Sequence, residues 1–137
     1  MLVEAGAIAP KFSLGGQQLP SPNSVLVFYR VTCPTCKLTL PYLHRLSVPA
    51  VGISQNDALD TASFEHRFEV KIPSVLDHEN DGFPVSNAYG VHHVPTLFVI
   101  DDKGKVTKRI EGFDKEALED LGVEFSESEK VPEFKPG

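Results

Sequence analysis

The segment Val25-Leu26-Val27-Phe28-Tyr29-Arg30-Val31-Thr32-Cys33-Pro34-Thr35-Cys36 decides the fold that the sequence predicts. Its first five residues form an unbroken apolar run of β-branched, aliphatic and aromatic side chains, which is typical of a strand covered on both faces. Beyond it, Cys36, Leu40 and Leu43 recur at spacings of four and three residues, which predicts a helix with a buried stripe. Cys33 is therefore expected at the exposed start of this helix, and Cys36 is expected to face inward one turn later.

The chemistry of this segment lies in its two cysteines, the only ones in the chain. A helix start has partial positive charge and unpaired N–H groups, which favour a thiolate over a thiol. We therefore predict a pKa for Cys33 well below the ordinary value of about 8.5, between about 5 and 7. The spacing places Cys36 within disulfide reach, so the pair is interpreted as a thiol–disulfide redox site and, from its few basic neighbours, as a mild reductant.

A cysteine pair of this kind has two other uses in proteins, as a structural disulfide and in a metal site. A structural disulfide across a two-residue gap would close too small a loop to restrain the unfolded chain much. A zinc site would need two more ligands, and the five histidines lack the usual spacing of zinc-binding pairs. A copper or zinc carrier using Cys33, Cys36 and either His92 or His93 stays open, because copper(I) accepts two thiolates.

Composition bounds the kind of protein. A chain of 137 residues is long enough for one domain with its own core. The net charge of −6 argues against nucleic acid or anionic membrane as a main partner. No apolar run reaches the length of about 18 residues needed to span a bilayer, and the N-terminus lacks the features of a signal peptide. We expect a cytoplasmic monomer that neither inserts into membranes nor binds nucleic acid.

Strands and helices alternate along the rest of the chain. Strands are expected at 50–53, 74–77, 96–100 and 105–110, and helices after Asn56 or Asp57, at 84–89 and after Asp114. Pro41 should kink the helix that contains it. The alternation predicts an α/β fold with a mixed sheet between two layers of helices. We place the domain at 1–122, with an irregular or hairpin-like lead-in at 1–24 and a loosely ordered acidic tail at 123–137.

Several segments together resemble a known family. They are Ala9–Leu14, Val25–Lys37 with Pro41 beyond it, Tyr89–Thr96 and Asp101–Lys105. Over residues 7–121 the chain resembles the thioredoxin-fold thiol–disulfide oxidoreductases. Within them it is most similar to the redoxin branch of TlpA-like proteins, related to the AhpC/TSA group, which includes cytochrome-maturation reductases. The Cys-x-x-Cys motif followed by Val94-Pro95-Thr96 in the right element order makes the resemblance specific.

The resemblance implies a fold, an activity and a set of site residues. The fold is the three-layer α/β/α thioredoxin fold, and the activity is reduction or exchange of protein disulfides through a mixed disulfide. The implied partners are protein substrates and an upstream thiol reductant, within cell redox homeostasis. No cofactor or metal is implied beyond the Cys33–Cys36 disulfide. Implied site residues are the catalytic Cys33, Cys36 and a cis Pro95, the substrate-binding Thr32, Pro34, Thr35 and Val94, and the modulators Lys37, His92 and His93.

This sequence departs from the family pattern at three positions. Thr32 stands where the family usually has Trp, and Val27 and Thr39 stand where family members keep a buried acid. Water or Lys37 could then accept the proton of the second cysteine. A peroxiredoxin-like thiol peroxidase is the nearest alternative activity, but such enzymes carry Thr three residues before the reactive cysteine, where this chain has Arg30. A redox-inactive binding scaffold is a third possibility, which the intact cysteine pair disfavours.

Overall fold

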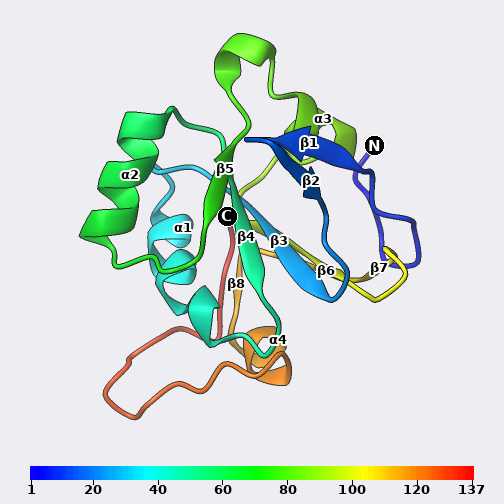
Figure 1. Cartoon of the computed structure of the whole chain (residues 1–137). Helices are drawn as coiled ribbons and strands as arrows, with labels where there is room; N and C mark the ends of the chain where they lie inside the picture. The colour runs from blue at the N-terminus through cyan, green and yellow to red at the C-terminus, as the bar shows by residue number, and fades with distance from the viewer.

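A mixed five-stranded sheet forms the centre of the computed structural model, which describes residues 1–137 (Figure 1). The strand order is β5-β4-β3-β6-β7. Strands β3, β4 and β5 run parallel, whereas β6 is antiparallel to both β3 and β7. The strands are β3 (Ser24–Tyr29), β4 (Ala50–Ser54), β5 (Ser74–Leu76), β6 (Thr96–Ile100) and β7 (Val106–Glu111). Every residue of β3 is buried, which confirms the predicted central strand.

Side chains alternate along β3 between two hydrophobic clusters. Val25 and Val27 face a cluster that includes residues of α1, α2 and α4, while Leu26 and Phe28 face one that includes α3 and the first hairpin. Because both faces of the sheet are covered, the predicted three-layer α/β/α architecture is confirmed. The helices are α1 (Pro34–Thr39), α2 (Ala58–Arg67), α3 (Pro84–Tyr89) and α4 (Lys115–Asp120), with 3₁₀ turns η1 (Leu40–Arg45) and η2 (Glu79–Asp81). No helix combines the length and apolarity needed to cross a bilayer.

Helix α1, which contains Cys36 and which we call the active-site helix, differs from the kinked helix that the sequence predicts. It stays α-helical only to Thr39 and continues as the 3₁₀ turn η1. Pro41 lacks the N–H that an α-helix would use here, and its ring opposes continuation of the α-helix. The predicted buried stripe is nevertheless present, since Cys36, Leu40 and Leu43 are at most 1% exposed.

The lead-in contains a short hairpin, as expected. Strands β1 (Phe12–Leu14) and β2 (Gln17–Leu19) pair in antiparallel fashion. The turn between them is Gly15-Gly16, with φ values of 57° and 76° that favour glycine. Leu19 from this hairpin reaches the core cluster that contains Phe28.

A buried carboxylate fixes the start of α3. Asp77, just after β5, is fully buried and accepts hydrogen bonds from the Val85 N–H at 3.0 Å and the Ser86 N–H at 2.7 Å. The Ser86 hydroxyl also donates to Asp77 at 2.6 Å. These bonds satisfy N–H groups that a helix start leaves unpaired. Helix α3 ends at Gly90, with φ 69°, from which the chain enters the segment 91–95 beside the cysteines.

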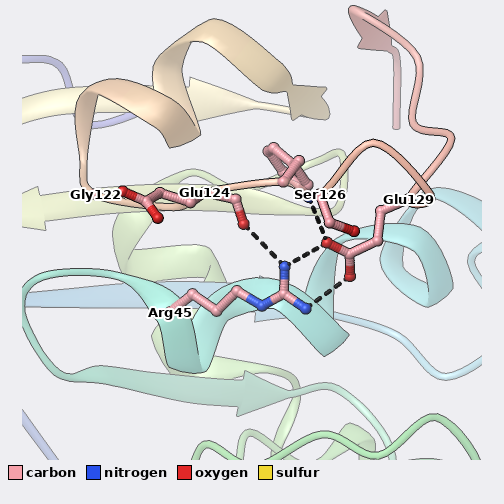
Figure 2. Close-up of a pocket in the computed structure, with 6 residues that line it drawn as sticks. Arg45, Gly122, Glu124, Ser126 and Glu129 are labelled. Atoms are coloured by element: carbon pink, nitrogen blue, oxygen red, sulfur yellow. Dashed lines mark hydrogen bonds and ion pairs between the residues drawn. The ribbon is translucent and has the colours of Figure 1, made fainter.

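The C-terminal residues run back toward α1 after α4. Arg45 binds the carboxylate of Glu129 through two contacts of 2.8 and 2.7 Å, and it also donates to the Glu124 carbonyl at 3.0 Å (Figure 2). Farther on, β9 (Phe134–Lys135) pairs antiparallel with β8 (Phe113–Asp114). Figure 1 shows this red end of the chain running beside β8 toward the middle of the fold. The division into a domain of 1–122 and a loosely ordered tail of 123–137 stays a prediction.

Replacing Asp77 by Ala should lower the free energy of unfolding by about 2–4 kcal/mol, because two buried N–H groups and a hydroxyl lose their acceptor. Urea denaturation of the wild type and the variant measures this loss. Asp81→Ala, which removes an exposed carboxylate from the neighbouring turn η2, is the matched control and should change stability by less than about 0.5 kcal/mol. Equal losses in the two variants would contradict the role given to Asp77.

Candidate active site

The two cysteines lie at the junction between β3 and α1. The chain leaves the sheet after Tyr29, turns, and begins the helix at Pro34, so Cys33 occupies the N-cap position. The Sγ of Cys33 accepts a hydrogen bond from the Cys36 N–H at 3.2 Å. Both thiols are free in this structure; Cys33 is half-buried, whereas Cys36 is fully buried. The predicted pair of one accessible and one inward-facing thiol is therefore present.

The surroundings of Cys33 favour its thiolate. Hydrogen bonding from the Cys36 side chain, together with the backbone N–H groups of Cys36 and Thr35, lowers the pKa of Cys33 to about 6 against the opposing effect of burial. The positive charge of Lys135 lowers the pKa of Cys33 further by a small amount. At pH 7 most Cys33 side chains are then thiolates.

The surroundings of Cys36 favour its thiol. Burial raises the pKa of Cys36 strongly, and its hydrogen bond to Cys33 raises that pKa further. The two sulfurs therefore have different roles. The accessible sulfur, with its low pKa, is the nucleophile, and the buried sulfur, with its raised pKa, stays protonated until the mixed disulfide forms.

The segment before β6 packs directly against the accessible thiol. The Val94–Pro95 peptide bond is cis, as the resemblance implied, and Pro95 is buried. In its thiol form Cys33 donates a hydrogen bond from Sγ to the Val94 carbonyl at 3.4 Å. This bond is lost when the thiolate forms, which leaves a backbone carbonyl facing the reactive sulfur.

Most of the other predicted site residues lie near this sulfur, and Lys37 is the exception. Thr32 and Pro34 are exposed beside Cys33. His92 and His93 are exposed and line, with Cys33 and Pro34, a cavity of about 370 Å³. Lys37 points elsewhere, with Nζ 5.9 Å from the centre of the Phe68 ring. Substrate-binding and modulating roles for these residues stay predictions.

Thr35 has a partner that the sequence did not indicate. Its buried hydroxyl donates to the carbonyl of Pro136, at 2.7 Å, from 101 residues away in the chain. Gly137 lines the cavity beside Cys33. The acceptor is a backbone carbonyl, which any residue supplies, so no sequence pattern could have predicted this contact.

A polar network also reaches the cavity from the other side. Arg30 lines it, donates from Nε to Gln55, and lies with its guanidinium 5.5 Å from the centre of the Phe83 ring. Gln55 in turn donates to the Ser86 hydroxyl at 2.9 Å, which is bonded to Asp77. Gln55 follows β4, and Ser86 lies in the first turn of α3. These segments are far apart in the sequence, so Gln55 and Ser86 come close to Arg30 only in the folded protein.

The two positions at which the family keeps a buried acid are filled by residues with other tasks. Val27 belongs to the core cluster beneath α1. Thr39 is fully buried and donates its hydroxyl to the Thr35 carbonyl at 2.7 Å. Neither can accept a proton from Cys36 as a carboxylate would.

No group of three or more His, Cys, Asp and Glu side chains is arranged to hold a metal ion. The two cysteines and the exposed histidines near them therefore do not form such a cluster in this conformation. What the arrangement offers is a thiolate, a second thiol one helical turn away and an exposed approach to the first.

An acidic thiol at a helix start, a buried partner thiol and a preceding cis-proline segment on a three-layer sheet define a thioredoxin-fold thiol–disulfide oxidoreductase. The Redoxin family matches residues 10–125, and the chain belongs to that family. It is 34% identical over 127 residues to the thiol-disulfide oxidoreductase ResA of Geobacillus thermodenitrificans, covering 80% of this chain and 71% of that protein.

Solved structures agree on the fold. The thio-disulfide isomerase of Thermus thermophilus superposes with a TM-score of 0.66 at 26% identity, over 90% of this chain and 100% of that one. The thioredoxin domain of a thiol-disulfide oxidoreductase from Bacteroides vulgatus gives a TM-score of 0.72 at 17% identity, over 88% of this chain and 99% of that one. The predicted class of enzyme and its fold are confirmed.

The pKa of Cys33 predicts how fast the reduced protein reacts with iodoacetamide as pH changes. Only the thiolate reacts, so a pKa of about 6 means that the rate falls about tenfold from pH 7 to pH 5 and levels off above pH 8. The rate is followed by mass spectrometry of the alkylated protein. Cys33→Ser is the control and should react slowly throughout, because Cys36 is fully buried. A midpoint above pH 8 would contradict the assignment.

Proposed function

We propose that this protein reduces disulfides in other proteins, with Cys33 as the attacking nucleophile and Cys36 as the resolving cysteine. The observation that supports this most directly is the division of the two thiols. One is half-buried with a pKa lowered to about 6, and the other is fully buried with a raised pKa. A dithiol arranged in this way can give up two electrons in two separate sulfur displacements.

The first displacement forms a mixed disulfide. The Cys33 thiolate bonds to one sulfur of the substrate disulfide, the substrate S–S bond breaks, and the other substrate sulfur leaves as a thiolate that is then protonated. The Cys36 N–H, at 3.2 Å from Sγ, stabilises the thiolate before attack. Pro34, His92 and His93 line the cavity beside this sulfur, and the exposed Thr32 precedes Cys33 in the chain.

The second displacement releases the reduced substrate. Cys36 loses its proton and its sulfur bonds to the Cys33 sulfur, which breaks the mixed disulfide and frees the second substrate thiolate. The protein is left with a Cys33–Cys36 disulfide, and the substrate has gained two electrons and two protons. With Val27 and Thr39 unable to act as a base, we assign the Cys36 proton to the departing substrate thiolate or to water.

The wider setting is also proposed. An upstream thiol reductant would return the disulfide to the dithiol form, because each turnover consumes the protein's own two electrons. The dithiol itself carries the electrons, so no bound cofactor or metal takes part. We propose that the protein acts as a monomer in the cytoplasm, and its net charge of −6 supports the monomeric state.

Trapping the mixed disulfide tests the assignment of roles. Cys36→Ser should accumulate a covalent adduct with a peptide closed by one disulfide, because attack still occurs and resolution cannot. A serine hydroxyl can still donate to Cys33, so the nucleophile keeps part of its stabilisation. Mass spectrometry under non-reducing conditions measures the adduct.

Cys33→Ser is the matched control and should form less than about a tenth as much adduct, since Cys36 is fully buried. Both variants should show cooperative thermal unfolding, which confirms that they are folded. An adduct that forms equally on Cys33→Ser, or that fails to form on folded Cys36→Ser, would contradict the proposed function.

A further inference from the structure

The last five residues, Glu133–Gly137, run from α4 to the edge of the cavity beside Cys33, and we call them the C-terminal strap. The Lys115 N–H donates to the Glu133 carbonyl at 3.0 Å, and the pairing of β9 with β8 follows directly. The Pro136 carbonyl then accepts the Thr35 hydroxyl at 2.7 Å. The strap thus spans from α4 to the first turn of the active-site helix.

Two glycines allow the strap to approach other backbone closely. A Cβ added at Gly112 would lie 2.5 Å from the Lys135 carbonyl oxygen, and one added at Gly137 would collide with the Val94 carbonyl oxygen. Val94 is the residue whose carbonyl faces the Cys33 sulfur at 3.4 Å. The tip of the strap therefore occupies the space directly beside the backbone that faces the reactive thiol.

The strap contacts the rest of the protein through backbone groups, as an extended peptide would, and these contacts are weak. Its contacts to β8, Thr35 and Val94 use backbone groups, which any extended polypeptide could offer in its place. All five of its residues are exposed, with Phe134 at 57%. Its one ion pair, Lys115 to Glu133 at 3.6 Å, involves a carboxylate that is 84% exposed and contributes little.

The base of the tail is held more firmly than the strap. Arg45 binds Glu129 with a bidentate contact, and the Ser126 N–H donates to the same carboxylate at 2.9 Å (Figure 2). This anchor keeps the strap close to its groove, which is the surface formed by β8, Thr35 and Val94, even when the tip is released. The effective concentration of the strap at this groove therefore stays high. The Redoxin match ends at residue 125, so the strap lies beyond the matched residues.

We propose that the C-terminal strap is an internal competitor for the groove beside Cys33, and that an extended substrate polypeptide must displace it before its disulfide reaches the thiol. Small disulfides enter instead through the exposed cavity beside His92 and His93 without displacing the strap. The strap would make the enzyme discriminate against polypeptide disulfides that cannot compete for this groove. The inference rests on the proposed function of Cys33 as the attacking nucleophile.

Gly137→Val tests the proposal in the full chain, because the added side chain cannot fit against the Val94 carbonyl and the tip must leave its groove. The rate constants of the reduced protein with insulin, as a polypeptide disulfide, and with oxidised glutathione, as a small one, are measured by stopped mixing and acid quench. The ratio of the insulin rate constant to the glutathione rate constant should rise about fivefold.

A second variant and a control make the test independent of one substitution. Glu129→Gln weakens the anchor at a distance from the thiol and should raise the insulin rate in the same direction. Glu127→Gln, an exposed change in the same tail, should leave both rates unchanged. If the insulin rate stays the same or falls in both folded variants, or if both substrates accelerate equally, the strap is not a competitor.

A measurement without disulfide exchange separates this proposal from the proposed function. Alkylation of Cys33 by a maleimide carried on a peptide should also accelerate about fivefold in Gly137→Val, whereas alkylation by iodoacetamide should not. An unchanged ratio of the two alkylation rates would overturn the strap proposal. If wild-type protein reduces neither insulin nor oxidised glutathione, the proposed function falls, and the alkylation ratio still decides the role of the strap.

Discussion

The hydrogen bonding from Cys36 to the Cys33 sulfur, by its side chain and by its backbone N–H, is the interaction on which the site depends. This geometry forms because the chain leaves the fully buried strand β3 and begins helix α1 at Pro34, shortly afterwards. The helix start supplies unpaired N–H groups at the place where the thiolate forms. One short segment thus provides the central strand of the sheet, the nucleophile and the group that stabilises it.

Much of this arrangement could be predicted from the sequence because it follows from local patterns. The apolar run 25–29 predicted the central strand, and the helical spacing after it predicted which cysteine faces inward. The sequence predicts helices after Asn56 or Asp57 and after Asp114. In the structure Asp57 and Asp114 cap these helices, each accepting a backbone N–H, at 2.8 and 3.0 Å. These features depend on residues within one turn or one strand of each other.

Other features depend on contacts that no local pattern encodes. The end of the α-helix at Thr39 reflects the balance between Pro41 and the packing of Leu40 and Leu43, so the sequence predicted a kink where the structure has a 3₁₀ turn. The roles of Asp77 and of the Thr35–Pro136 bond arise only when distant segments meet. Apart from the Ser86 hydroxyl, their partners are backbone groups, which every type of residue supplies.

The site and the strap act on the same sulfur in opposite ways. Hydrogen bonding from the Cys36 side chain, the backbone N–H groups and, to a smaller extent, the charge of Lys135 favour the thiolate. The end of the strap that carries Lys135 lies beside the backbone that faces this sulfur. A nucleophile that is both activated and partly covered would react readily with small disulfides and more selectively with large ones. This selectivity would come from residues beyond the part of the chain that matches the family.

The central claim is that Cys33 and Cys36 form a reversible two-electron couple, and the most direct test is its reduction potential. The protein is equilibrated in glutathione buffers of graded potential, and free thiols are trapped and counted by mass. A Cys33 pKa of about 6 lies between those of the reference reductant and oxidant, nearer the reductant, so the account predicts a potential between about −270 and −200 mV. A potential above about −150 mV would contradict the assignment as a reductant. Failure of the pair to cycle reversibly would contradict the redox function itself.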